Sequence, residues 1–241
     1  MAAGPVAAAP AAAGPVAAAP AAAGPAAAGR VLGATVRGDV RDVHVVLPDG
    51  TAPPSGVPAD MFAAAVAAYL AGRRLDMQSL ARDLGVGRAT LYRRAGNREQ
   101  LLDEVIWWRG RRMVAGQLLA TAHLRGVARI AAVVSGALRA IEGDRPLHAF
   151  ISSEPDAALR ILTGSRSVAG HGMATALGNL IDLERSRGAF DADLDTPTLA
   201  YAIIRISEGF LYADVIADRQ PDIGRAITVI QALLIGLDRA G

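Results

Sequence analysis

The 241-residue sequence contains no cysteine and no lysine, and only 4% of its residues are aromatic. Without cysteine the chain has no disulfide, no thiolate zinc site and no cysteine nucleophile, which suits a reducing compartment. Its apolar runs stop short of the roughly 18 residues that a membrane-spanning helix needs. The four histidines show no metal-ligand spacing. We therefore expect a cytoplasmic protein without a membrane segment, a metal or a cofactor.

The charge of the chain is small in sum but unevenly placed. The formal net charge is +2, and all 25 basic residues are arginine. Ten arginines stand against six acidic residues between Ala59 and Arg112, whereas acidic residues are in excess from Met113 onward. A localised basic block is typical of a surface that binds nucleic acid, although a solvated helical face has the same composition.

The first 58 residues differ from the rest in composition. Residues 2–29 consist of AAGPVAAAPA written twice and followed by a degraded third copy. Proline recurs through these repeats and removes backbone donors, so the segment cannot build a core. We predict that residues 1–58 are a disordered extension; a translation start further downstream is the alternative.

Helical patterns follow one another from Pro58 to the end, with no convincing strand, which predicts an all-α fold. Asp60, Asp76 and Asn97 are placed to cap the first, second and fourth helices. Further helices are predicted over residues 124–142, 146–163, 165–187, 196–218 and 222–239. We divide this part into two helical domains, 59–106 and 107–241.

The stretch from Met77 to Leu91 has the steric pattern of a helix-turn-helix. Ala81 is small where two helices would cross, and Gly85 stands where the turn needs a positive φ. Leucine and valine occupy the positions that fill the wedge between the helices. The residues from Arg73 to Arg98 include seven arginines and two acidic residues, so the pattern coincides with the basic block.

The segment LARDLGVGRATLYRRAGNREQLL resembles the helix-turn-helix of the TetR family of transcriptional repressors. Tyr92 matches the tyrosine that ends the family's recognition helix, and Arg98 replaces a lysine. Ala95 stands where the family has phenylalanine, so we expect Trp107 or Trp108 to fill that corner. This departure and the two tryptophans resemble the subgroup of regulators of quorum-signal degradation.

The resemblance implies that residues 87–94 form the recognition helix and lie in the major groove of an operator. Some of the side chains would read base edges and others would hold phosphates. The expected DNA contacts are Gln78, Ser79, Arg88, Ala89, Thr90, Tyr92, Arg93 and Arg98.

The last two helices carry more apolar residues than a single buried face needs, which predicts a homodimer through a four-helix bundle. The expected interface residues are Leu199, Ile203, Ile206, Gly209, Phe210, Ile223, Ile227, Ile230, Leu234 and Leu237. Burial of both faces inside one subunit is the alternative.

By the same resemblance, the helices between the DNA-binding domain and the dimer face would enclose a small apolar or amphipathic effector whose binding releases the operator. The aromatic, soft or polar side chains able to line such a pocket are Trp107, Trp108, Met113, His148, Phe150, His171, Met173, Asn179, Tyr201, Arg205 and Tyr212. A ligand-independent architectural DNA-binding protein is the alternative, followed by an all-α enzyme, for which the sequence offers no catalytic residues.

Overall fold

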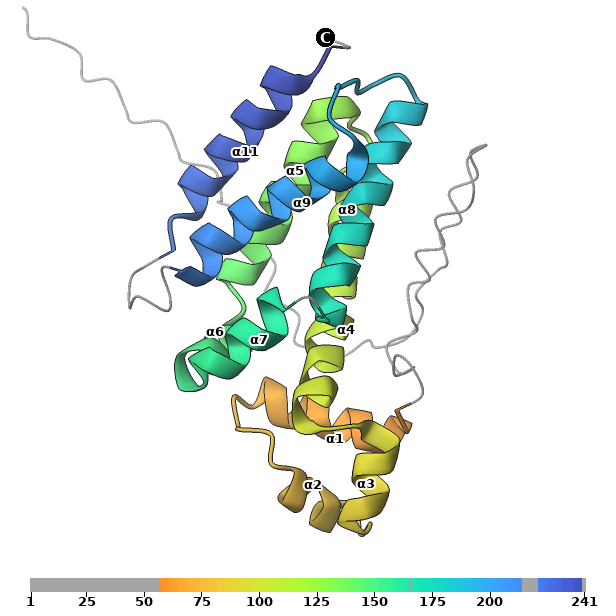
Figure 1. Cartoon of the computed structure of the whole chain (residues 1–241), viewed down its shortest axis with the longest axis vertical. Helices are drawn as coiled ribbons and strands as arrows, with labels where there is room; N and C mark the ends of the chain where they lie inside the picture. The colour runs from red at the N-terminus through yellow and green to blue at the C-terminus, as the bar shows by residue number, and fades with distance from the viewer. Residues whose placement is uncertain (1–56, 165, 214–220, 240–241) are drawn as a thin grey trace, which may run out of the picture. The chain divides into compact units, whose positions relative to one another are not determined.

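The computed structural model describes residues 57–164, 166–213 and 221–239, coloured in Figure 1. These residues are helical and contain no strand, which confirms the predicted all-α class. The helices are α1 (Ala59–Leu70), α2 (Met77–Asp83), α3 (Arg88–Ala95), α4 (Arg98–Ala120), α5 (Gly126–Glu142), α6 (Arg145–Ser153), α7 (Pro155–Thr163), α8 (Val168–Ser186), α9 (Thr196–Glu208), the π-helix η1 (Gly209–Ala213) and α11 (Ile223–Leu237). Of the predicted disordered extension, residues 1–58, the first 56 lie outside these ranges, whereas Val57 is described and is buried. No helix within them is long and apolar enough to cross a membrane.

The helix predicted over residues 146–163 is two helices, α6 and α7. Glu154 separates them with φ −142° and ψ 60°, outside the helical region. Pro155 directly follows and begins α7. Proline disfavours the helical conformation of the residue before it and lacks a backbone donor, so a continuous helix was the wrong prediction here.

The turn between α2 and α3 confirms the helix-turn-helix pattern. Asp76 caps α2 by accepting hydrogen bonds from two backbone N–H groups. Gly85 adopts φ +64°, and the backbone N–H of Val86 donates to the carbonyl of Ala81 at 3.0 Å, which closes the end of α2. Ala81 and Leu91 are buried where the two helices cross. The small and positive-φ positions in the sequence therefore fix the angle between α2 and α3.

The corner between α3 and α4 is closed by a polar side chain. Asn97 and Gln100 form a capping box at the start of α4, each bonding the other's backbone N–H. A Cβ atom on Gly96 would lie 2.5 Å from Oε1 of Gln100, so glycine leaves the space that Gln100 occupies. The side chain beside Gly96 is therefore Gln100, and the expectation that Trp107 or Trp108 fills the corner at Ala95 stays a prediction.

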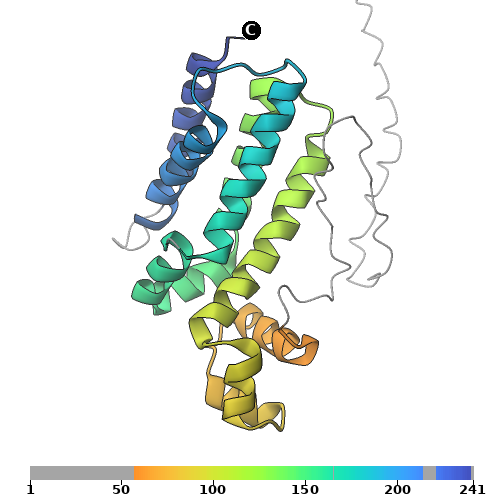
Figure 2. The same cartoon turned by 45° about the vertical axis from the view of Figure 1, so that its right-hand side comes forward.

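Two apolar cores divide the helices. The first joins α1, α2, α3 and the first half of α4 to α6 and α7. The second joins α5, α8, α9 and α11. Helix α4 packs against α1, α5, α7 and α8, and Figure 2 shows it running alongside α8. Because the first core crosses residue 106, the domain boundary placed there stays a prediction.

Buried carboxylates join α4 and α5 to α8. Asp103 of α4 accepts hydrogen bonds from the backbone N–H groups of Val168 and Ala169, at 2.7 and 3.0 Å, and from the hydroxyl of Ser167. Glu184 of α8 is fully buried and accepts from Arg129 of α5 at 2.8 Å. A carboxylate at a helix N-terminus satisfies backbone donors that no helical carbonyl can reach. Asp103 thus fixes where α8 begins relative to α4.

Replacing Asp103 by alanine removes this cap and leaves buried backbone donors unsatisfied. We expect Asp103→Ala to lower the free energy of unfolding by about 3 kcal/mol, measured by urea denaturation. Asp83→Ala, at an exposed position of α2, is the control and should change stability little. Equal stabilities of the two variants would contradict the assigned role of Asp103.

Candidate functional site

Helix α3 presents a basic outer face. Arg88, Arg93 and Arg94 are exposed, and Tyr92 is 42% exposed, although the opposite face of the same helix is buried against α1 and α2. The short helix is anchored by Leu91, which is fully buried. An exposed basic helix held at a fixed angle by a tight turn has the form of a recognition helix for the major groove.

The two DNA contacts expected on α2 are Gln78 and Ser79, and their backbone N–H groups are already hydrogen-bonded within the protein. The backbone N–H groups of Gln78 and Ser79 both donate to the carboxylate of Asp76, at 3.3 and 2.8 Å. Hydrogen bonds from Ser79 are the largest cause of a lowered pKa for the Asp76 carboxyl. The hydrogen bond from the backbone N–H of Gln78 lowers this pKa further. Any phosphate contact from Gln78 or Ser79 must therefore come from the side chain rather than from the backbone N–H.

Arg98 was expected to hold a phosphate, and in the structure its side chain is also bound within the protein. Its Nε donates to the carbonyl of Leu75 at 2.7 Å, and its Nη2 donates to Oε1 of Glu154 at 2.5 Å. The side chain is only 21% exposed. Its neighbour Glu99 pairs with Arg160 of α7 at 2.8 Å. Arg98 therefore ties the start of α4 to the α6–α7 junction, and a phosphate contact would have to use its remaining N–H donors.

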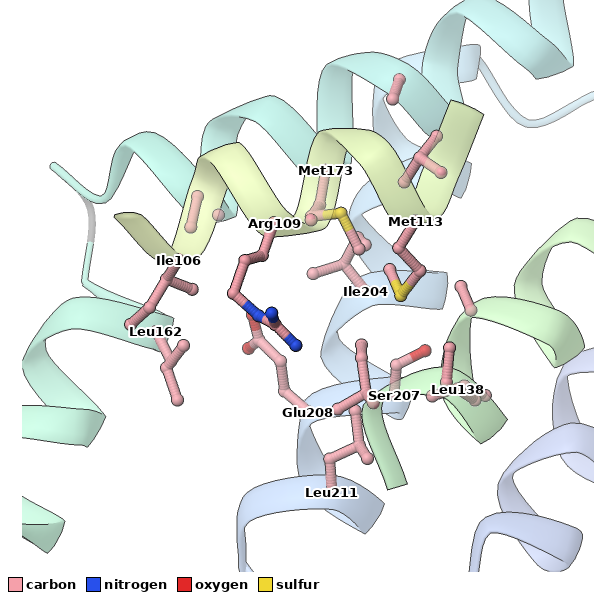
Figure 3. Close-up of a pocket in the computed structure, with 18 of the residues that line it drawn as sticks. Ile106, Arg109, Met113, Leu138, Leu162, Met173, Ile204, Ser207, Glu208 and Leu211 are labelled. Atoms are coloured by element: carbon pink, nitrogen blue, oxygen red, sulfur yellow. The ribbon is translucent and has the colours of Figure 1, made fainter. Parts of the chain in front are cut away.

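A cavity of about 280 Å³ lies among α4, α5, α8, α9 and η1. Most of its wall is apolar, and Met113, Leu138 and Met173 are among the lining residues in Figure 3. Tyr69 of α1 also belongs to the wall. An element of the helix-turn-helix unit thus contributes directly to the surface of the cavity.

Four of the predicted effector contacts line this cavity: Trp107, Met113, Met173 and Tyr212. The predicted residues that do not line it are Trp108, His148, Phe150, His171, Asn179, Tyr201 and Arg205. Trp108 packs edge to face on Phe62 of α1 with 5.8 Å between ring centroids, and Phe150 is buried in the first core. The two histidine rings lie within hydrogen-bonding distance of backbone carbonyl oxygens, and the remaining three residues are exposed.

The polar end of the cavity was missed by sequence reasoning. Arg109 of α4 bonds the Asp144 carboxylate through Nε at 3.2 Å and Nη2 at 2.7 Å. Its guanidinium also lies over the ring of Tyr69, 5.9 Å from the centroid. Glu208 of α9 lines the same cavity and pairs with Arg205 at 2.8 Å. These residues are far apart in sequence, and each reads as an ordinary surface charge in the chain.

Burial in the cavity wall raises the pKa values of Glu208, Tyr69 and Tyr212. Desolvation raises the pKa of Glu208, and the Arg205 guanidinium opposes this rise. Desolvation likewise raises the pKa values of the Tyr69 and Tyr212 phenols. Both phenols are therefore protonated at neutral pH and can donate hydrogen bonds into the cavity.

The predicted dimer stripe lies largely inside the subunit. Six of its residues are buried in the second core, namely Leu199, Ile203, Ile223, Ile227, Ile230 and Leu234. Ile206, Phe210 and Leu237 are partly buried, and Gly209 is exposed. The outward face instead shows Tyr201, Val229 and Ile235, which are 62%, 41% and 66% exposed. The structure therefore reverses the predicted face for these six residues, because α9 and α11 pack on α5 and α8.

Two comparisons with known proteins found matches, one to the second half of the sequence and one to the fold. The profile of the Tetracyclin repressor-like C-terminal domain matches residues 125–235. The structure of the R. erythropolis transcriptional repressor QsdR from the TetR family is similar, with a TM-score of 0.64 and 29% sequence identity. The match covers 74% of this chain and 94% of that chain. No curated protein matches the chain.

Trp107 lies against Gly172 of α8, and this contact generates a testable prediction. A Cβ atom at Gly172 would lie 2.3 Å from the indole ring, whereas one at Gly178 of the same helix would meet only a methyl group, at 3.6 Å. We expect Gly172→Ala to lower the free energy of unfolding by about 1–3 kcal/mol through overpacking. Gly178→Ala should raise it by up to about 1 kcal/mol through helix propensity. Urea denaturation measures both, and the same sign for both variants would contradict the Trp107 placement.

Proposed function

This chain belongs to the TetR family of transcriptional regulators, and we propose that it is a cytoplasmic repressor that binds a palindromic operator as a homodimer. The observation that carries the proposal is the α2–turn–α3 geometry, in which Gly85 fixes the angle of an exposed arginine-bearing helix. Arg88, Ala89, Thr90, Tyr92 and Arg93 are proposed to face the major groove. Gln78 and Ser79 are proposed to contact the flanking phosphates through their side chains.

Arg88, at the first turn of α3, is proposed to read base edges. An operator can be selected from a library of random 30-base-pair duplexes and its affinity measured by fluorescence anisotropy. We expect Arg88→Ala to weaken operator binding by about 1–3 kcal/mol and to relax preference at one base pair of each half-site. The control Arg139→Ala, an exposed arginine of α5, should bind like the parent protein. Unchanged affinity and selectivity of Arg88→Ala would overturn the proposed orientation of α3.

Dimerisation is proposed to use the outward face of α9 and α11. One helix-turn-helix reads only a short half-site, so two recognition helices about 34–36 Å apart are needed to read a palindrome. The exposed apolar side chains of Tyr201, Val229 and Ile235 lie on the two helices that the second core leaves at the edge of the subunit. Covering these side chains with a partner would remove apolar surface from water, which favours association.

A carboxylate placed in this face should break the dimer, because the interface would bury it without a counter-charge. We expect Ile235→Glu to convert the protein to monomers at micromolar concentration, measured by sedimentation velocity. Leu119→Glu is the matched control, since Leu119 is 50% exposed on α4, which lies across α8 from α11 in Figure 2. A dimer that survives Ile235→Glu but not Leu119→Glu would place the interface elsewhere.

The cavity is proposed to hold an effector whose binding releases the operator. Tyr69 of α1 and Arg109 of α4 both line it, so a ligand there would contact helices that position α3. A ligand shifts DNA affinity only if it binds the DNA-free arrangement more tightly, and shared wall residues provide that difference. The cavity also favours a sensor over a ligand-independent architectural DNA-binding protein, which has no need of one.

A further inference from the structure

The charged groups at the polar end of the cavity are compensated in pairs. The Arg109 guanidinium is paired with Asp144, and the Glu208 carboxylate is paired with Arg205. Figure 3 shows Arg109 from α4 and Glu208 from α9 extending into the same space. Burying a further charge is expensive unless a free counter-charge receives it. An ionic ligand would therefore have to break one of these pairs.

Hydrogen-bonding capacity remains at the polar end although the charges are compensated. Arg109 gives Nε and Nη2 to Asp144, and a guanidinium carries five N–H donors in all. A carboxylate has about four lone-pair sites, so Glu208 can accept from a ligand while it is paired with Arg205. The head group that fits between them both accepts from Arg109 and donates to Glu208. Amide and hydroxyl groups do both without a net charge.

The rest of the cavity sets the size and shape of the ligand. Its side walls carry Met113, Val134, Leu138 and Leu177, which offer no hydrogen bonds to a ligand. A cavity of about 150 Å³ accepts benzene, with six carbon atoms. The volume of about 280 Å³ therefore suits about eleven non-hydrogen atoms.

From these observations we propose that the cavity binds an uncharged aliphatic compound of about eleven non-hydrogen atoms, with one amide or hydroxyl head group held between Arg109 and Glu208. The proposal rests on the proposed function, because it assigns a ligand class to the effector cavity. The tail of the compound lies against the methionine and leucine side chains of α4, α5 and α8.

Four probes with about eleven non-hydrogen atoms each separate charge from size: nonanamide, decan-1-ol, nonanoate and decylammonium. Isothermal titration calorimetry with the full chain, in the absence of DNA, measures their affinities at pH 7. We expect nonanamide and decan-1-ol to bind at least ~10-fold more tightly than either ion, because the ions find no free counter-charge. Tighter binding of nonanoate or decylammonium, or no binding of any probe, would overturn the ligand class.

Glu208→Gln tests the charge balance itself. The substitution keeps the size of the side chain and removes one negative charge, so the polar end gains an excess positive charge. We expect nonanoate to gain at least ~10-fold relative to nonanamide in this variant. Glu142→Gln, at an exposed position of α5, should leave the ratio unchanged. A ratio that does not move in Glu208→Gln would also overturn the proposal, whereas operator binding by the ligand-free protein tests the proposed function separately.

Discussion

The contact between the Asp103 carboxylate of α4 and the first turn of α8 supports both the helix-turn-helix and the cavity. It holds α4 in one register along α8, because two backbone donors of α8 bind the carboxylate oxygens. One turn further along α4, Trp107 lies flat against Gly172, and after another half turn Arg109 enters the cavity. The same helix begins at the capping box that follows α3. The junction with α3 and the residues of α4 that line the cavity are therefore held at fixed positions along one helix.

Local chemistry made the DNA-binding half readable from the sequence. Gly85, Ala81 and the caps Asp76 and Asn97 each act within a few residues of themselves, so their spacing predicts the structure directly. The tie between Arg98 and Glu154 spans 56 residues, and no local pattern announces it. The sequence consequently predicted the turn and the helix that follows it, but it gave no sign that the Arg98 guanidinium binds Leu75 and Glu154 within the protein.

In the second half of the chain, the sequence predicted where most helices lie but not which of their faces are buried. Helix α11 carries apolar residues around most of its circumference, so periodicity alone could not decide which of them face the core. Packing on α5 and α9 made that choice and left Ile235 outside. The polar residues of the cavity wall were equally hard to predict from the sequence. Asp144 caps the start of α6 and Glu208 ends α9, and only the fold brings both residues to the wall of one cavity.

Tyr69 belongs both to the first core and to the wall of the cavity. The residue is 5% exposed within the core that supports α2 and α3, and it also faces the cavity beside Arg109. Altering it would change the DNA-binding half and the ligand site together. Leu138 of α5 and Leu177 of α8 also line the cavity but carry no such double duty, since both belong to the second core. A substitution at Leu138 or Leu177 would therefore reshape the cavity and leave the core beneath α2 and α3 in place, whereas a substitution at Tyr69 would alter both.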